Sequence, residues 1–170
     1  DATLDRTTGA ALDFDLGIEG SGTPQNLVWA VRVEDGKVYV AGSFSRVQGK
    51  AQPMLAAAEL ATGNPVPVPL ATRFNGARDD AWIAAVALAE GRLAVGGSME
   101  SMGGVPRPHA AAFSLITGAL LDWDPAPDHS VLTLAGQGNA LLLGGTFTNC
   151  GGAESRGVAK VDPVLGRGDP

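Results

Sequence analysis

The chain has 170 residues, a formal net charge of −6 and a pI near 4.7. Its hydrophobic fraction of 45% with only 18% charged residues excludes a disordered chain, because disorder requires low hydrophobicity and high net charge. The acidic balance argues against nucleic acid as a partner, since phosphate binding depends on Lys and Arg. No apolar run is long enough for a transmembrane segment.

The first predicted element is a strand in a partial unit, residues 1–25. Ala2-Thr3-Leu4-Asp5 leads into the turn Thr7-Thr8-Gly9. A whole unit, residues 26–78, follows with apolar stretches at 28–33, 37–44, 55–60 and, more weakly, 66–70. Asp35-Gly36 joins the first two stretches, and this dipeptide between apolar runs predicts a β-hairpin.

The same pattern recurs twice more along the chain. A second whole unit, residues 79–127, carries its strand pair from Ile83 to Met99 and a weak fourth stretch at 120–123. A partial unit, residues 128–170, carries its strand pair from Val131 to Phe147. The turn glycines 9, 63, 118 and 166 are 54, 55 and 48 residues apart, which indicates a repeat of about 50 residues.

The repeat predicts an all-β fold. Stretches such as Val38-Tyr39-Val40-Ala41 are apolar on both faces of a strand, so both faces of each sheet need covering. A β-propeller of four-stranded antiparallel blades meets that need, because each blade packs between two neighbours. Gly42, Gly97 and Gly145 recur at one position of the second strand, where we expect close packing of backbones.

These motifs resemble the delta-60-like β-propeller repeats (the DUF5122 type) of bacterial secreted and surface proteins. The resemblance runs nearly from end to end. The residues that carry it include Asp35-Gly36-Lys37, Gly42-Ser43-Phe44-Ser45, Gly103-Gly104, Gly145-Thr146-Phe147-Thr148, Gly151-Gly152 and Leu121-Asp122-Trp123-Asp124-Pro125. It implies a propeller fold and an extracellular or cell-surface setting, and it implies no catalytic residues.

Two whole and two partial blades are too few for closure, because propellers usually have four to eight blades. We therefore expect the chain to be part of a larger propeller. Another segment of the same precursor or another copy of the chain would complete it. The start at Asp1, without an initiator Met or a signal peptide, fits a chain cut from a longer precursor.

Candidate ionisable sites are few. His109 is a candidate general base or metal ligand, but no partner lies near it in sequence, so we interpret it as a loop histidine. A metal pair with His129 is the alternative. Close carboxylates are the ligands that Ca²⁺ requires, and they occur at Asp13 with Asp15, Asp79 with Asp80, and Asp122 with Asp124. None forms the spaced acidic loop of an EF-hand, so we predict no cofactor and keep Ca²⁺ as the alternative.

The candidate nucleophiles occupy repeat positions. Ser43, Ser98 and Thr146 are equivalent in the repeat, which indicates a structural role, and no Gly-x-Ser-x-Gly or P-loop motif is present. Cys150 replaces Val47 and Met102 of the other units and is interpreted as a hydrophobe. A reactive thiol is the alternative.

Two further motifs are candidate ligand contacts. Arg167-Gly168-Asp169 spells an integrin-binding tripeptide, which we attribute to chance because it falls in a repeat turn. Trp29, Trp82 and Trp123 are candidates for a carbohydrate platform. We expect Trp123 to be packed and Trp82 to be the exposed member.

The sequence thus favours a non-catalytic extracellular or cell-surface module for structural scaffolding or for protein or glycan recognition. We assign no catalytic, cofactor-binding or metal-binding residues. The alternative is a hydrolase or lyase with a site at the propeller channel, built from His109, Asp79 and Asp80, because propellers host enzymes as well as binding sites. An uncharged rim would favour the module, and converging ionisable residues would favour the enzyme.

Overall fold

The computed structural model describes residues 3–4, 7–8, 11–12, 14–20, 27–66 and 81–167. All regular elements in these ranges are β-strands. A membrane-crossing helix, long and apolar enough to span the bilayer, is not found among them.

The first blade is a four-stranded antiparallel sheet. It consists of β4 (Leu27–Glu34), β5 (Lys37–Ser43), β8 (Leu55–Glu59) and β9 (Pro65–Val66), which are neighbours in chain order. The hairpin between β4 and β5 turns at Asp35 and Gly36, with φ of 48° and 70°. These angles are left-handed, as expected of an Asp-Gly hairpin turn.

The second and third blades repeat the first three strands. The second contains β10 (Trp82–Ala89), β11 (Arg92–Ser98) and β14 (Ala110–Ser114). The third contains β15 (Val131–Gln137), β16 (Ala140–Gly145) and β19 (Val158–Val161).

The weak fourth strand expected at 120–123 is reduced to one bridge between Phe113 and Leu120. The chain leaves the sheet there because Trp123 is buried and its indole Nε1–H donates to the Asp162 carbonyl of the third blade at 3.0 Å.

Short hairpins extend the connection between the second and third strands of each blade. They are β6 (Arg46–Val47) with β7 (Lys50–Ala51), β12 (Ser101–Met102) with β13 (Val105–Pro106), and β17 (Asn149–Cys150) with β18 (Ala153–Glu154). β3 (Ile18–Glu19) adds to β6. A further small pair, β1 (Thr3–Leu4) with β2 (Ala11–Leu12), precedes the blades.

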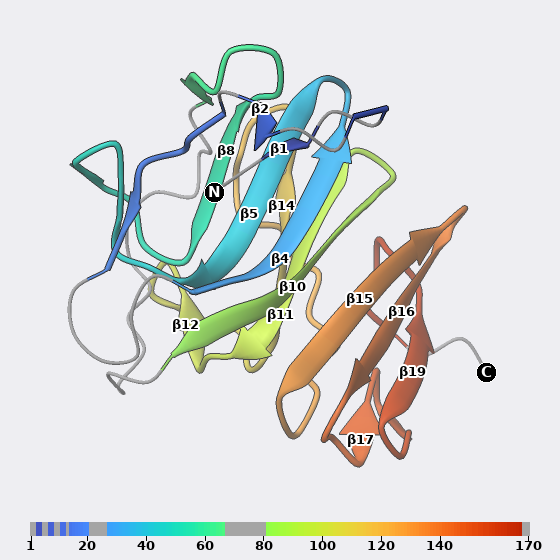
Figure 1. The fold of residues 1–170 in the computed structure, drawn as a ribbon. Helices are drawn as coiled ribbons and strands as arrows, with labels where there is room; N and C mark the ends of the chain where they lie inside the picture. Colours follow the sequence, from blue (N-terminus) through green and yellow to red (C-terminus); the bar gives the residue numbers. More distant parts are fainter. Residues whose placement is uncertain are drawn as a thin grey trace.

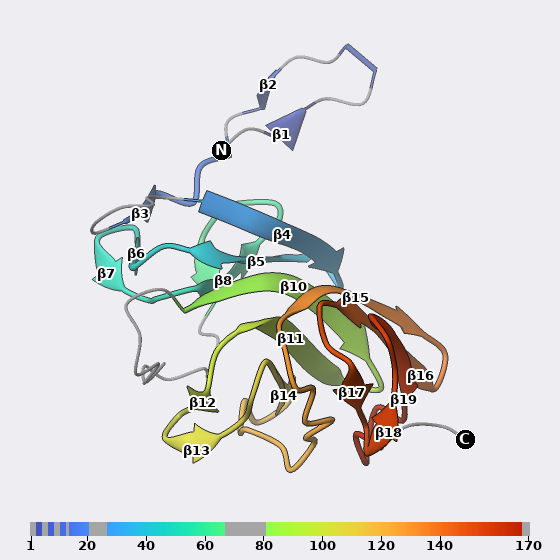
Figure 2. The ribbon, with the colours of Figure 1, turned by 90° about the horizontal axis from the view of Figure 1, so that it is seen from below.

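The three blades fan out from their first strands. β10 lies beside both β4 and β15, and the sheets diverge from this inner row toward the periphery (Figures 1 and 2). This arrangement is that of consecutive propeller blades, and the all-β propeller class predicted from the sequence is confirmed. The blade boundaries at 25/26, 78/79 and 127/128 stay a prediction.

Apolar side chains fill the spaces between blades. One cluster lies between the first and second blades and includes Tyr39, Leu55, Ile83 and Val95. A second lies between the second and third blades, and a third covers the other face of the first blade with Leu16 and its neighbours. Both faces of the second blade are therefore buried, as their apolar sequence requires.

The outer faces of the first and third blades are exposed in part. Val31 and Val33 of β4 are exposed, and so are Leu142 of β16 and Val158 of β19. Closed propellers usually have four or more blades, so the three described blades correspond to part of a propeller.

Candidate functional site

One end of every blade has the same backbone construction, which we call the rim. At each rim position, a residue of the first strand pairs with a glycine of the second strand and is followed by an unpaired bulge residue. The amide of that glycine donates to the residue that precedes or begins the third strand. The equivalent sets are Trp29, Gly42 and Met54, then Ala84, Gly97 and His109, and finally Leu132, Gly145 and Gly157.

The glycines are required by close contact within the blade. A Cβ on Gly42 would lie 1.8 Å from the Leu27 carbonyl oxygen, and one on Gly97 would lie 2.0 Å from that of Trp82. The close packing of backbones predicted for these glycines is confirmed. It occurs between neighbouring strands of one blade, where the bulge pushes the first strand against the second.

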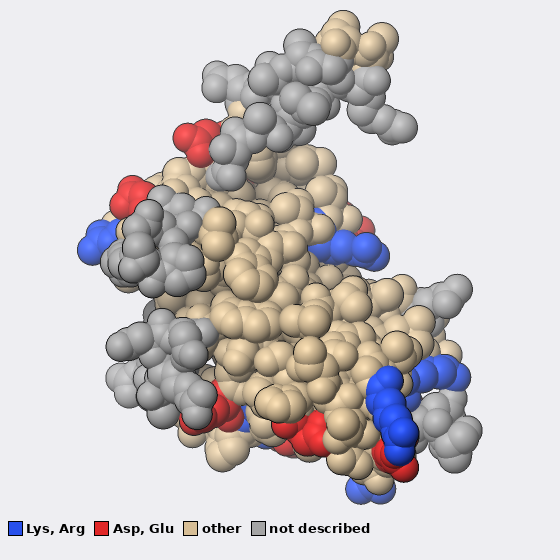
Figure 3. Space-filling view, turned by 60° about the horizontal axis from the view of Figure 1, so that its bottom comes forward, with Lys and Arg blue, Asp and Glu red and all other residues tan. Residues whose placement is uncertain are grey.

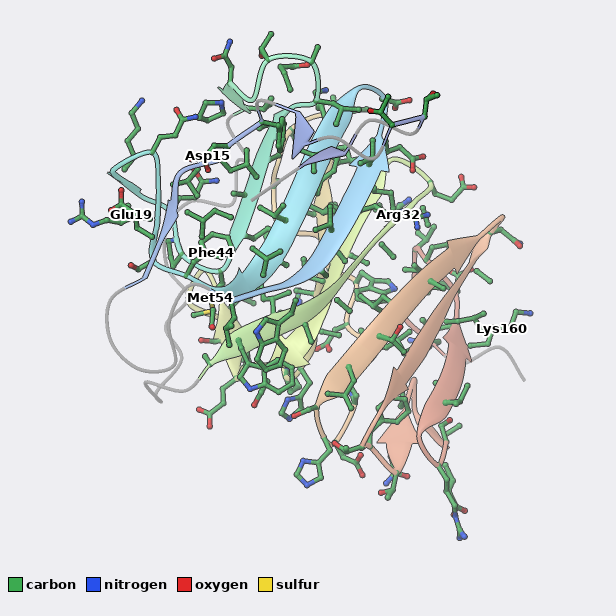
Figure 4. The ribbon with its side chains drawn as sticks, in the orientation of Figure 1. Asp15, Glu19, Arg32, Phe44, Met54 and Lys160 are labelled. Atoms are coloured by element: carbon green, nitrogen blue, oxygen red, sulfur yellow. The ribbon has the colours of Figure 1, made fainter. Side chains whose placement is uncertain are left out.

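Two rim residues have left-handed backbone conformations that glycine usually supplies. Met54 has φ of 63° and His109 has φ of 61°, whereas the third blade has Gly157 at 82°. The amide of His109 donates to the Met99 carbonyl at 2.9 Å, and its carbonyl accepts from Gly97 at 3.0 Å. Such strain in non-glycine residues clusters at functional sites. Met54 lies at the rim end of the first blade, close to Phe44 (Figure 4).

A stacked tryptophan pair is the main apolar feature of the rim. The rings of Trp29 and Trp82 have centroids 4.9 Å apart and planes inclined by 27°. Trp29 is 46% exposed, and Trp82 is half-buried.

The exposure of the three tryptophans agrees only in part with the sequence prediction. The packing predicted for Trp123 is confirmed, because that residue is buried. The prediction that Trp82 is the exposed member was wrong, because Trp29 lies over it. The sequence contained a signal for Trp29: the equivalent residues are Ala84 and Leu132, so a large ring is not needed for the blade core.

The structure brings the two histidines together. The ring centroids of His109 and His129 are 6.3 Å apart, although the residues come from different loops. Burial lowers the pKa of His109, and the nearby His129 lowers it further. The Nδ1 atom of His109 is buried without a hydrogen-bond partner. His109 is therefore a neutral imidazole near pH 7.

No third metal ligand joins the histidines. Within the described ranges, no group of three His, Cys, Asp or Glu side chains has the arrangement of a metal site. The neighbouring carboxylate of Asp128 is directed elsewhere, because it accepts hydrogen bonds from Thr148 and Asn149. These hydrogen bonds, chiefly from the Thr148 side chain, hold the pKa of Asp128 well below its usual range.

The paired carboxylates have protein partners. Arg107 lies 3.8 Å from Asp122 and 4.0 Å from Asp124. Asp124 also accepts from the Ala126 amide at 2.9 Å, and Asp15 accepts from the Gly17 amide at 2.8 Å in the same local geometry. Asp15 and Asp124 therefore stabilise turns, and Arg107 is the ion-pair partner of Asp122 and Asp124. Asp13, Asp79 and Asp80 lie outside the described residues.

The remaining candidates follow the repeat. Ser98 is the register partner of Trp82, and the hydroxyl of Ser43 is buried without a partner. Cys150 is buried like Val47 and Met102, and burial raises the pKa of its thiol to about 11. The hydrophobic role predicted for Cys150 agrees with this burial. Arg167 is exposed, whereas Gly168 and Asp169 lie outside the described residues.

Among the described residues, the middle of the rim face carries few charged side chains, and the carboxylate of Asp128 lies near His109. Figure 3 shows uncharged residues across the middle of the described surface in this view, while the Lys, Arg, Asp and Glu side chains drawn there lie mostly toward its margins. In the described part of the chain, Trp29, Trp82, Ser98, His109 and His129 form the candidate site. It offers an aromatic surface with neighbouring hydroxyl and imidazole groups.

A comparison with protein families finds a match to part of the first blade. The family model described as "Domain of unknown function (DUF5122) beta-propeller" matches residues 34–56. The match begins at the end of β4, contains all of β5 and the hairpin β6–β7, and ends within β8. No curated protein matches the chain. The resemblance predicted from Asp35-Gly36-Lys37 and Gly42-Ser43-Phe44-Ser45 is thus confirmed over this segment, which is similar to the DUF5122 β-propeller family.

Proposed function

We propose that this chain is a non-catalytic β-propeller module that recognises a protein or glycan through its rim. The supporting observation is Trp29, a large ring that is 46% exposed and is stacked on Trp82. Exposed aromatic residues with a few neighbouring polar groups are typical of recognition surfaces.

The test is a binding screen of the whole chain against arrays of peptides and glycans. Binding that is lost in Trp29→Ala and kept in Ile116→Ala supports recognition through the rim, because Ile116 is an exposed apolar residue in the turn after β14. Binding that survives Trp29→Ala, or an absence of any binding, would contradict the proposal.

The alternative is a hydrolase or lyase that uses the histidines. The observation in its favour is the 6.3 Å approach of His109 to His129 and the lowered pKa of His109, which suits a general base. The candidate nucleophiles Ser43, Ser98 and Thr146 occupy repeat positions, which favours the module. Turnover of chromogenic glycoside, ester or uronate substrates that disappears in His109→Ala would establish the enzyme in place of the module.

The setting of the module is the cell surface or the extracellular space. The basis is the resemblance to repeats of secreted and surface proteins. An antibody raised against the chain should label intact cells of its source as strongly as lysed cells. Labelling only after lysis would refute this location.

The partner that completes the ring is another segment of the same precursor or another copy of the chain. The exposed faces of β4 and of the third blade support this, because the equivalent faces of the second blade are covered by neighbouring blades. Light scattering should give a mass above that of one chain, or the precursor should supply further repeats. A single-chain mass with cooperative unfolding would argue against completion.

A further inference from the structure

Trp29 has one face available for a ligand. Its other face is stacked on Trp82 with 4.9 Å between ring centroids, so its 46% exposure belongs to the outward face and the ring edge. The residue is the bulge of β4, between the register pairs of Val28 and Ala30. The bulge and the supporting indole fix the ring, and a fixed ring loses little side-chain entropy when a ligand binds.

Polar side chains continue the rim beyond the tryptophans. Ser98 is the register partner of Trp82. The backbone of His109 bonds to Gly97 and Met99, the two residues that flank Ser98. His129 is exposed beside His109. A hydroxyl group and the neutral imidazole of His109 both donate and accept hydrogen bonds, and this combination matches hydroxyl groups at the edge of a ligand.

We propose that Trp29 is the platform for one ring of a neutral pyranose chain whose hydroxyl groups are equatorial. This inference rests on the proposed recognition function and names its ligand class. An equatorially substituted pyranose presents C–H groups on its flat faces, which match the negative face of an indole. Its hydroxyl groups lie around the edge, where Ser98 and the histidines supply partners. An anionic sugar would require Lys or Arg, which lie mostly toward the margins of this face among the residues drawn in Figure 3.

Cellohexaose is the probe, because it is neutral and all its ring substituents are equatorial. Calorimetry and tryptophan fluorescence would follow its binding to the whole chain, and hexagalacturonate would serve as the anionic comparison. Trp29→Ala should weaken cellohexaose binding by about tenfold, the loss expected for one aromatic contact. Trp29→Phe should weaken it less, because a smaller ring remains.

Leu132→Ala is the matched control. Leu132 is the bulge residue of the third blade and is 47% exposed, almost the same as Trp29. Its removal should leave cellohexaose binding unchanged. Equal losses from both alanine variants would show that the exposed bulge residues act as a general apolar surface, and this would overturn the sugar platform.

The outcomes separate this inference from the proposed function. If the chain binds peptides through Trp29 but not cellohexaose, the recognition function stands and the sugar platform is refuted. If cellohexaose binds and shorter products accumulate, the platform stands and the non-catalytic function fails. Tighter binding of hexagalacturonate than of cellohexaose would overturn the neutral ligand class. Circular dichroism of each variant establishes that the fold is kept, and Trp29→Phe provides the measurement should the alanine variant unfold.

Discussion

β4 and β10 occupy the same position in successive blades, yet their burial differs strongly. Val31 and Val33 of β4 are 60% and 50% exposed, whereas the equivalent Val86 and Leu88 of β10 are 7% and 9% exposed. Each strand pairs with the following strand in the same register and with the same bulge. The difference therefore comes from the neighbouring blade, which covers this face of β10 and leaves these positions of β4 open.

The rim end of the two strands does not show this difference. Gly42 and Gly97 both lie in close contact with a carbonyl oxygen of the first strand. Their amides donate hydrogen bonds to the carbonyls of Met54 and His109, which have nearly the same positive φ. The rim is built within each blade, so it persists where a neighbour is missing. Burial of the strand centres depends on stacking of the blades, and rim geometry does not.

We expect the largest loss of stability from removing the tryptophan that is buried between the second and third blades. Trp123→Ala should lower the free energy of unfolding by about 4 kcal/mol, because it empties a buried site between the second and third blades. Trp29→Ala should cost less than about 1 kcal/mol, because Trp29 is half exposed. Urea unfolding of the whole chain measures both. Similar losses would mean that Trp29 belongs to the core.

The second prediction concerns the two strands themselves. Leu88→Ala should cost about 3 kcal/mol, and the equivalent Val33→Ala should cost less than about 1 kcal/mol, because only Leu88 leaves a cavity. Urea midpoints of the two variants compare them directly. If a further blade covers β4 in the complete assembly, the cost of Val33→Ala should rise there toward that of Leu88→Ala. Equal losses of stability for the two variants in the isolated chain would contradict the exposure of this face of β4.

The third prediction concerns the rim, where the two strands should respond alike. Gly42→Ala and Gly97→Ala should each cost about 2 kcal/mol or more, because the new Cβ overlaps a carbonyl oxygen of the same blade. Thermal unfolding provides the measurement, and Gly36→Ala in the open hairpin turn serves as a control for backbone conformation alone. A much milder effect at Gly42 would mean that rim geometry also depends on the neighbouring blade.

The smallest effect is expected from the pH dependence of an exposed contact. Asp128 accepts hydrogen bonds from Thr148 and Asn149, and these depress its pKa in the folded chain. Because the pKa of Asp128 is lower in the folded chain than in the unfolded chain, where it is about 4, the ionised carboxylate stabilises the fold fully above about pH 4. This stabilisation is lost as the pH falls below that value.

The stability difference between the unmodified chain and Asp128→Asn should therefore be largest near pH 7 and should shrink below about pH 4. Thermal midpoints measured across this range test the prediction, with Glu34→Gln at the exposed end of β4 as the comparison. A difference that grows on acidification would contradict the role of the ionised carboxylate.

The sequence by itself determined the repeat, the strand positions and the rim glycines. These features are local, because the turn Asp35-Gly36 and the apolar runs around it define a hairpin without reference to the rest of the chain. The burial of Trp123 and Cys150 also followed from repeat position, since equivalent residues of equivalent blades meet similar neighbours.

Only the tertiary structure decided which tryptophan is exposed and which side chains meet at the rim. Trp29 and Trp82 belong to different blades, and His109 meets His129 across a connection between two blades. Such contacts depend on the angle and offset at which one sheet packs on the next, and these arise from the sum of many side-chain contacts between blades. A repeat pattern specifies each blade alone, so it could not show that Trp82 supports Trp29 or that β4 lies open.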